Sequence, residues 1–209
     1  MLRISDAALG ALGQIAAKAV QPCPPAEKRK GSKEAAAKAA KLKLEKLKKD
    51  AEQARKDAIA MLKKTLEALE KWDDGAKKKA KTWFGSDSDA VKAKMTERTK
   101  KVMKHLEGMT EDNFEPATSK YKKTYGYVYP DKDDKVYLGE SFSKAPATGD
   151  DSKAGTLVHE VSHFDSVSGT RDEDKTYGHA SCKKLAKKSP TKAQNNADSY
   201  EYFVEDTAK

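Results

Sequence analysis

The chain has 209 residues, enough for one catalytic-sized domain and an extension. Charged residues make up 36% of it, the formal net charge is +9, and the mean hydropathy is −0.88. No stretch approaches the length of a membrane span. The basic charge would suit nucleic acid or an anionic surface. Because the aromatic residues do not interleave with the basic runs, we favour a solvated lysine coat on long helices over a nucleic-acid partner.

The first half of the chain predicts helices. Residues 1–32 indicate a short N-terminal helix followed by a Pro-rich linker, Gln21–Ser32. From residue 33 to residue 72, strong helix formers place apolar side chains on one face and lysines and acids on the other. This pattern predicts a long lysine-rich helix over residues 33–72. It begins a second unit, residues 33–209, and leads into the rest of that unit. A further helix is expected over Ser88–Glu107.

The second half adds a small β element. Between Tyr121 and Phe142 the apolar residues alternate with a period of about two, with a turn at residues 130–134, which predicts a β-hairpin. Two more helices are expected, over residues 179–188 and 192–205. The fold class is therefore predicted to be mainly α, of the α+β type, with one small hairpin or sheet.

One motif points to metal chemistry. His159-Glu160-Val161-Ser162-His163 is an H-E-x-x-H sequence. On a helix, residues four apart lie on the same face, so both histidines could bind one zinc ion, with Glu160 beside it to transfer a proton. A catalytic zinc site normally has three protein ligands and an open position for water.

The third ligand has four candidates. Asp165 is only two residues beyond His163 and would point away from the face that the histidines share. Asp172 follows Gly169-Thr170, a break at which the chain can turn back toward the metal, and Asp174 competes with it closely. His179 would complete a site made of histidines alone.

With G-T-x-D at residues 169–172 and Y-G at residues 177–178, the motif resembles the aspzincin metallopeptidases, the deuterolysin group. Within that group the chain most resembles the peptidyl-Lys metalloendopeptidases, which cleave on the amino side of lysine. The resemblance runs over roughly residues 55–206. It also includes Thr82–Ser86, Tyr127–Pro130, Val136–Leu138, Lys144–Pro146, Ala154–Val158 and Asn196–Phe203, in family order.

The resemblance implies a zincin-like metalloprotease domain with one catalytic zinc ion. It implies that His159, His163 and Asp172 are the ligands, Glu160 the general base and Tyr177 a donor to the oxyanion. The aspartate and the Y-G lie two residues further apart here than in the family pattern. Asp174 therefore stays open as the alternative third ligand.

The last predicted helix carries two acidic residues that are candidates for binding the substrate. Asp198 and Glu201 lie three residues apart, and spacing alone favours a solvated acidic pair. In the family, N-A-D-x-x-E-Y-F places this pair at the pocket for the substrate lysine. Two partly desolvated carboxylates would select an ammonium group over a neutral side chain.

These observations predict a zinc-dependent endopeptidase that hydrolyses X-Lys bonds by means of zinc-activated water and Glu160. Its partners would be proteins or peptides with an accessible lysine. The alternative is a lysine-rich helical protein that binds nucleic acid or an anionic surface and has a non-catalytic zinc site. That alternative predicts binding that depends steeply on salt.

The sequence also suggests a cellular location. Polar residues interrupt the apolar N-terminal run, so we identify no conventional signal peptide. With only two cysteines, Cys23 and Cys182, the chain is expected to fold without disulfides in the cytoplasm. Export would then use a specialised route, as for a bacterial toxin or effector with a secretion or immunity partner. Whether Cys23 pairs with Cys182 is left open.

Overall fold

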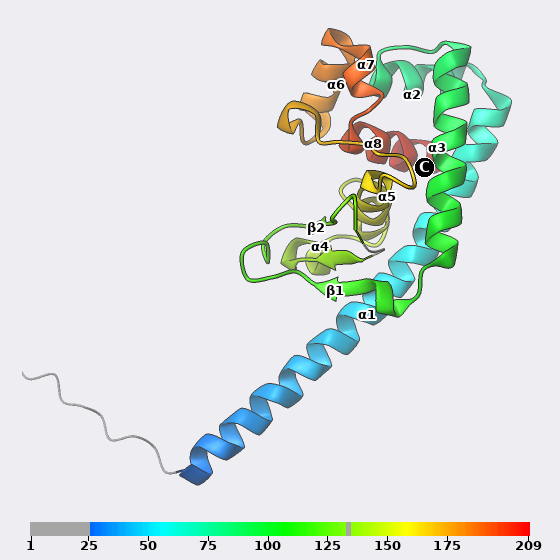
Figure 1. Cartoon of the computed structure of the whole chain (residues 1–209). Coiled ribbons are helices and arrows are strands. Elements are labelled where there is room, and N and C mark those ends of the chain that lie inside the picture. The colour runs from blue at the N-terminus through cyan, green and yellow to red at the C-terminus, as the bar shows by residue number, and fades with distance from the viewer. Residues whose placement is uncertain (1–25, 133–134) are drawn as a thin grey trace, which may run out of the picture. The chain divides into compact units, whose positions relative to one another are not determined.

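The structure, a computed structural model, describes residues 26–132 and 135–209, and within these it is mainly helical with one small sheet (Figure 1). The predicted N-terminal helix and Cys23 therefore lie outside the described residues. The chain divides into two units, Met1–Ala39 and Ala40–Lys209, and the second holds the core and the candidate site. The helices are α1 (Ala26–Lys71), α2 (Asp74–Phe84), α3 (Asp89–Gly108), α4 (Glu140–Lys144), α5 (Lys153–His163), α6 (His179–Lys188), α7 (Pro190–Ala193) and α8 (Ala197–Ala208), with 3-10 turns at Glu111–Asn113 and Glu173–Lys175.

Helix ends follow local side-chain chemistry. After α1, Trp72 adopts a positive φ of 46°, and Asp73 then caps α2 by accepting the Ala76 N–H. Ser88 caps α3 in the same way through the Val91 N–H. Such caps satisfy backbone donors that have no partner within the helix. They explain why α2 begins at Asp74 and α3 at Asp89.

The sheet has three short strands in the order β1-β3-β2: β1 is Phe114–Pro116, β2 Gly126–Tyr127 and β3 Val136–Leu138. β2 and β3 are antiparallel, which confirms the predicted hairpin. β1 pairs with β3 in parallel and was not predicted. Three residues are too few to show a period of two, so no pattern in the sequence indicated this strand.

Helix α5 lies between the small sheet and α8 (Figure 1). All of its residues from Ala154 to His163 are buried. Leu157, Val158 and Val161 join the core, which also takes in Phe203 and Val204 of α8. The helix that carries the H-E-x-x-H motif is therefore held on several sides by packed apolar side chains.

Two boundaries differ from the prediction. Helix α1 begins at Ala26, so residues 26–32, expected in the linker, are helical; their neighbours are strong helix formers that tolerate one glycine. The helix expected over 192–205 is instead α7 and α8, separated by residues 194–196. Asn196 lies in that break and forms a β-bridge with Arg171, which joins the break to the loop that carries Asp172. The division of the chain at residues 32 and 33 stays a prediction.

A buried arginine joins three segments around α5. Arg98 of α3 is 4% exposed. Its Nε donates to Ser168 Oγ and its Nη1 to the Gln194 carbonyl, both at 2.7 Å. Burial lowers the pKa of this guanidinium to about 10. Arg98 therefore fixes the loop that follows α5 and the turn that precedes α8.

We expect Arg98→Met to lower the free energy of unfolding by about 1–3 kcal/mol, because a partly buried carbonyl and hydroxyl lose their donor. Denaturant unfolding would measure the change. Lys101→Met on the same helix is the control: Lys101 is exposed and pairs with the exposed Glu97, so its loss should be within about 0.5 kcal/mol. Equal effects of both substitutions would contradict the role given to Arg98.

Candidate metal centre and substrate pocket

The two motif histidines face each other on α5. Ser152 starts this helix by accepting the Gly155 N–H at 2.9 Å. One turn separates His159 from His163, and their Nε2 atoms lie 3.1 Å apart. Each residue is 8% exposed. Two imidazole nitrogens so placed point at one position, as the i, i+4 spacing predicts.

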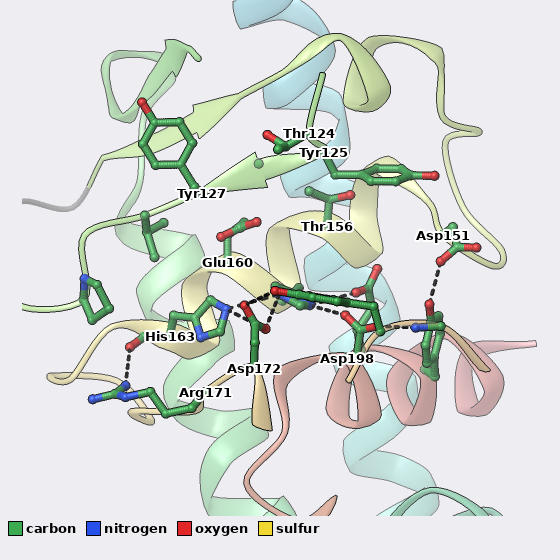
Figure 2. A pocket seen from close by; sticks show the side chains of 18 residues that line it. Thr124, Tyr125, Tyr127, Asp151, Thr156, Glu160, His163, Arg171, Asp172 and Asp198 are labelled. Atoms are coloured by element: carbon green, nitrogen blue, oxygen red, sulfur yellow. Dashed lines mark hydrogen bonds and ion pairs between the residues drawn. The ribbon is translucent and has the colours of Figure 1, made fainter. Parts of the chain in front are cut away.

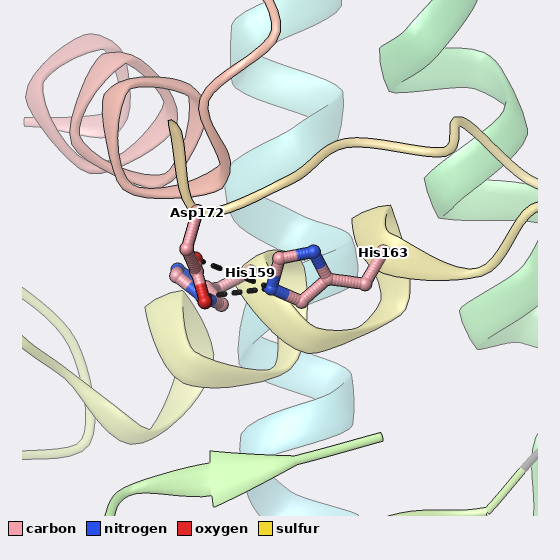
Figure 3. A group of neighbouring side chains, drawn as sticks. All are labelled: His159, His163 and Asp172. Carbon is pink, nitrogen blue, oxygen red and sulfur yellow. Dashed lines mark hydrogen bonds and ion pairs between the residues drawn. The ribbon is translucent and has the colours of Figure 1, made fainter. Parts of the chain in front are cut away.

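The chain then turns back and brings a carboxylate to the same position. Gly169, with a φ of 59°, allows the reversal, and the Thr170 N–H bonds to the Ser162 carbonyl at 3.0 Å. Asp172 Oδ1 consequently lies 3.3 Å from His159 Nε2 and 3.4 Å from His163 Nε2 (Figure 3). These three groups can therefore meet one ion.

The donor set fits a zinc ion. Asp172 Oδ1 is buried and has no hydrogen-bond donor among the described residues. A buried carboxylate oxygen without a donor is costly, and a cation would satisfy it. Two imidazole nitrogens and one carboxylate oxygen are ligands that zinc takes at catalytic sites, with a fourth position left for water.

The other candidates for the third ligand are engaged elsewhere. Asp165 accepts from Arg171 at 2.7 Å. Asp174, in the left-handed region at φ 52°, pairs with Lys192 at 2.7 Å. His179 packs edge-on against Tyr202, with ring centroids 4.1 Å apart, and lies with Asp150 and Glu205 in a separate group. The structure brings Asp172 to the histidines and not these three.

The outer nitrogens of both histidines are also held. His163 Nδ1 lies 2.9 Å from the Thr170 carbonyl oxygen. His159 Nδ1 lies 3.0 Å from Glu201 Oε2 and 3.1 Å from Asp198 Oδ1. Such contacts fix the ring orientation and leave Nε2 free to coordinate. The sequence did not indicate that the two acids of α8 would contact the motif helix.

Glu160 lies beside the histidines under the edge strand β2. It is 6% exposed, and burial raises the pKa of its carboxyl. A Cβ atom added at Gly126 of β2 would lie 2.9 Å from Glu160 Oε1 and 3.0 Å from its Cγ. Only a glycine leaves Glu160 its present room. The importance of Gly126 could not be seen in the sequence, because it depends on a contact between distant segments.

Tyr177 reaches the same site from the loop before α6. Its hydroxyl donates to Asp172 Oδ2 at 2.9 Å, although 54% of the residue is exposed. Burial and the Asp172 carboxylate raise the pKa of this phenol to about 12. Tyr177 therefore stays protonated and able to donate at neutral pH.

These groups line one cavity of about 620 Å³ (Figure 2). Asp198 and Glu201 form one part of its wall, and their side chains are 8% and 9% exposed. Burial raises the pKa of Glu201 to about 7. Asp151, Tyr125 and Tyr202 also line the cavity, and sequence reasoning missed all three. The acids of α8 are thus a cavity wall and not the solvated pair that spacing alone favoured.

A third acid of α8 supports the wall from behind. Glu205 is 2% exposed and accepts from the N–H and the hydroxyl of Ser152, at 3.0 and 2.7 Å. It therefore ties α8 to the beginning of α5, where negative charge is favourable. Burial and the neighbouring Glu201 raise the pKa of its carboxyl.

An H-E-x-x-H helix, an aspartate from the loop that follows it and a buried glutamate in a cleft define the zincin class of metallopeptidase sites. The family model described as lysine-specific metallo-endopeptidase matches residues 69–205. The chain belongs to this family, the aspzincins. The predicted family and enzyme class are confirmed.

Known relatives agree with this assignment. An extracellular protease of Aeromonas hydrophila is 57% identical over 83 residues, which are 40% of this chain and 23% of that protein. The peptidyl-Lys metalloendopeptidase of Grifola frondosa is 44% identical over 59% of this chain and 34% of its own length. The chain thus spans about a quarter of the first relative's length and about a third of the second's. A solved zinc peptidase from Grifola frondosa superposes with a TM-score of 0.65 at 35% identity, over 76% of this chain and 93% of that one, which confirms the predicted fold.

The predicted cytoplasmic location was wrong. The Aeromonas relative is named an extracellular protease, which contradicts that location. The prediction failed because a low cysteine count was interpreted as a sign of the compartment. Cys182 is buried with a free thiol, and Cys23 lies outside the described residues. None of the described helices is both long enough and apolar enough to cross a membrane.

We expect Gly126→Ala to lower kcat/KM for peptide hydrolysis by about a hundredfold, because the new methyl group would displace the Glu160 carboxylate by a fraction of an ångström or more. Zinc affinity should change little. Gly108→Ala is the matched control, since a Cβ there would meet no atom within 4 Å. Full activity of Gly126→Ala would show that Glu160 is not placed by this contact.

Proposed function

We propose that the protein is a secreted endopeptidase that uses zinc to hydrolyse peptide bonds on the amino side of lysine. The observation that carries the proposal is the convergence of His159, His163 and the donor-free oxygen of Asp172 beside the buried Glu160. The family, and relatives named as peptidyl-Lys metalloendopeptidases, support the reaction and the substrate class.

His159, His163 and Asp172 would hold the metal. When bound, zinc polarises the scissile carbonyl and lowers the pKa of water at the site. Glu160 accepts the proton of the attacking water and passes it to the nitrogen of the leaving amine. Its raised pKa suits the first transfer, since a carboxylate with an ordinary pKa would accept the proton less readily.

Tyr177 donates a hydrogen bond to the oxygen that becomes negative as the carbonyl is attacked. Its exposure lets the ring move, and its hydroxyl must leave Asp172 Oδ2 to reach that oxygen. Donors of this kind contribute about a hundredfold or more to the rate. Asp172 then keeps its other oxygen for the metal.

Asp198 and Glu201 give the cavity its preference for lysine. An ammonium group offers three donors to two nearly buried carboxylates, which a neutral side chain cannot replace. The Asp151 carboxylate adds negative charge at the same cavity. Protein or peptide substrates with an accessible lysine are therefore the proposed partners.

The alternative of a lysine-rich protein that binds nucleic acid or an anionic surface is not favoured. It requires a zinc site without catalytic function. Here the three donors, the buried Glu160 and Tyr177 line one open cavity together.

The first test is digestion of an unfolded protein of known sequence, with cut sites mapped by mass spectrometry. We expect cuts before lysine that stop with a chelator and return with zinc, because the metal is needed for the reaction. Glu160→Gln should lower the rate by at least about a hundredfold while zinc still binds. Chelator-sensitive cuts without a lysine preference would remove the roles of Asp198 and Glu201, and no cutting by zinc-loaded protein would refute the proposed activity.

A pair of substitutions tests the third ligand. Asp172→Asn should weaken zinc binding strongly, because a neutral amide is a poorer ligand than a carboxylate. Asp174→Asn should leave it nearly unchanged, because Asp174 pairs with Lys192 at the surface. Competition with a chromogenic chelator measures both affinities. The reverse order would assign the metal to Asp174 and require a different path for the loop.

A further inference from the structure

Both acids of the proposed lysine pocket contact one nitrogen of a proposed metal ligand. His159 Nδ1 makes a hydrogen bond with Glu201 Oε2 at 3.0 Å, and Asp198 Oδ1 lies 3.1 Å away. His159 Nε2 faces His163 and Asp172. Nδ1 is therefore the nitrogen that carries a proton when Nε2 coordinates, and it has one N–H to donate.

The two acids differ in their remaining contacts. Asp198 Oδ2 accepts the Gly178 N–H at 2.7 Å, so the loop that carries Tyr177 holds this carboxylate. Glu201 Oε1 lies against α5 at Gly155, where an added Cβ would come within 2.8 Å of it and would also collide with Glu205. Glu201 is thus packed between the motif helix and a second acid, and its Oε2 is aligned with His159.

We propose that Glu201 is a positioning residue for the metal as well as an acid of the pocket, an inference that rests on the proposed function. Its carboxylate accepts the Nδ1–H of His159 and so turns Nε2 toward Asp172 and His163. The Gly178 N–H holds Asp198 through Oδ2. Asp198 Oδ1 lies near His159 Nδ1 but does not receive its proton, which goes to Glu201. Asp198 is therefore the acid with the greater share in binding the substrate ammonium.

The charges around the cavity leave Asp198 able to take a cationic partner from the substrate. Among the described residues that line it, Arg171 is the only lysine or arginine. Its guanidinium donates to Asp165 and to the Thr170 carbonyl. The cavity thus supplies no lysine or arginine partner for Asp198, and a substrate lysine can take that place.

The test is the zinc dissociation constant, measured by chelator competition on the full chain. Glu201→Gln should weaken zinc binding by about 10–100-fold, the usual loss when a partner of a ligating histidine is removed. Glu201→Asp, which withdraws the carboxylate by one methylene group, should weaken it too and serves if the glutamine variant folds poorly. Asp198→Asn should cost less zinc affinity than either.

Asp151→Asn is the matched control. It removes the same charge from the same cavity, but Asp151 accepts from the Tyr202 hydroxyl at 2.7 Å and contacts no motif histidine. Its zinc affinity should stay close to that of the unchanged protein. A loss equal to that of Glu201→Gln would reduce the effect to general electrostatics and overturn the inference.

A second readout separates the two acids. At saturating zinc, the ratio of kcat/KM for a lysine peptide to that for its norleucine analogue should fall more in Asp198→Asn than in Glu201→Gln. If Glu201→Gln binds zinc as tightly as the unchanged protein, and the latter cleaves before lysine, the inference fails and the proposed function stands. If the unchanged protein neither binds zinc nor cleaves, the proposed function itself fails.

Discussion

The site depends on the meeting of three side chains at one position: the buried His159 and His163, and the partly exposed Asp172, whose Oδ1 is buried. Two of them come from a single turn of α5, and the third comes from a loop that reverses at Gly169. Without a cation, a nearly buried carboxylate oxygen lies there without a hydrogen-bond donor. Such an arrangement is unfavourable by itself and persists only if the surrounding packing holds the three side chains in place. Binding of a metal ion would offset the unfavourable free energy.

That packing is the contact of α5 with α8. Apolar side chains join the two helices along their length, and three acids of α8 face the motif helix. Glu205 bonds to the start of α5, Glu201 to His159 in its middle, and Asp198 to the loop before α6 through Gly178. Each acid therefore holds a different segment of the site. This arrangement has an electrostatic cost. Burial disfavours the charged forms of Glu201 and Glu205 and so raises their pKa values.

The sequence predicted whatever depends on short-range spacing. The H-E-x-x-H pair, the long helix, the hairpin and the helix over residues 179–188 follow from periodicity, and the resemblance added Asp172, Tyr177, Asp198 and Glu201 as candidates. Spacing could not decide between Asp172 and Asp174, because the path of a loop depends on remote contacts such as those of Arg98 and Asn196. The room that Gly126 leaves for Glu160 is equally invisible, since β2 and α5 are distant in the chain.

On the proposed function, this enzyme cleaves beside lysine while it carries many lysines of its own, and their helical backbone limits self-cleavage. The lysines concentrate on α1, α2, α3 and α6, where the backbone N–H and C=O groups are bonded within the helix. The proposed cleft lies beside the short edge strand β2, next to which a substrate binds most readily as an extended chain. A helical lysine would first have to lose its backbone hydrogen bonds to enter, which opposes cleavage while the helices stay folded. On the proposed function, the lysine coat is therefore compatible with the specificity, because exposure of the side chain does not expose the peptide bond.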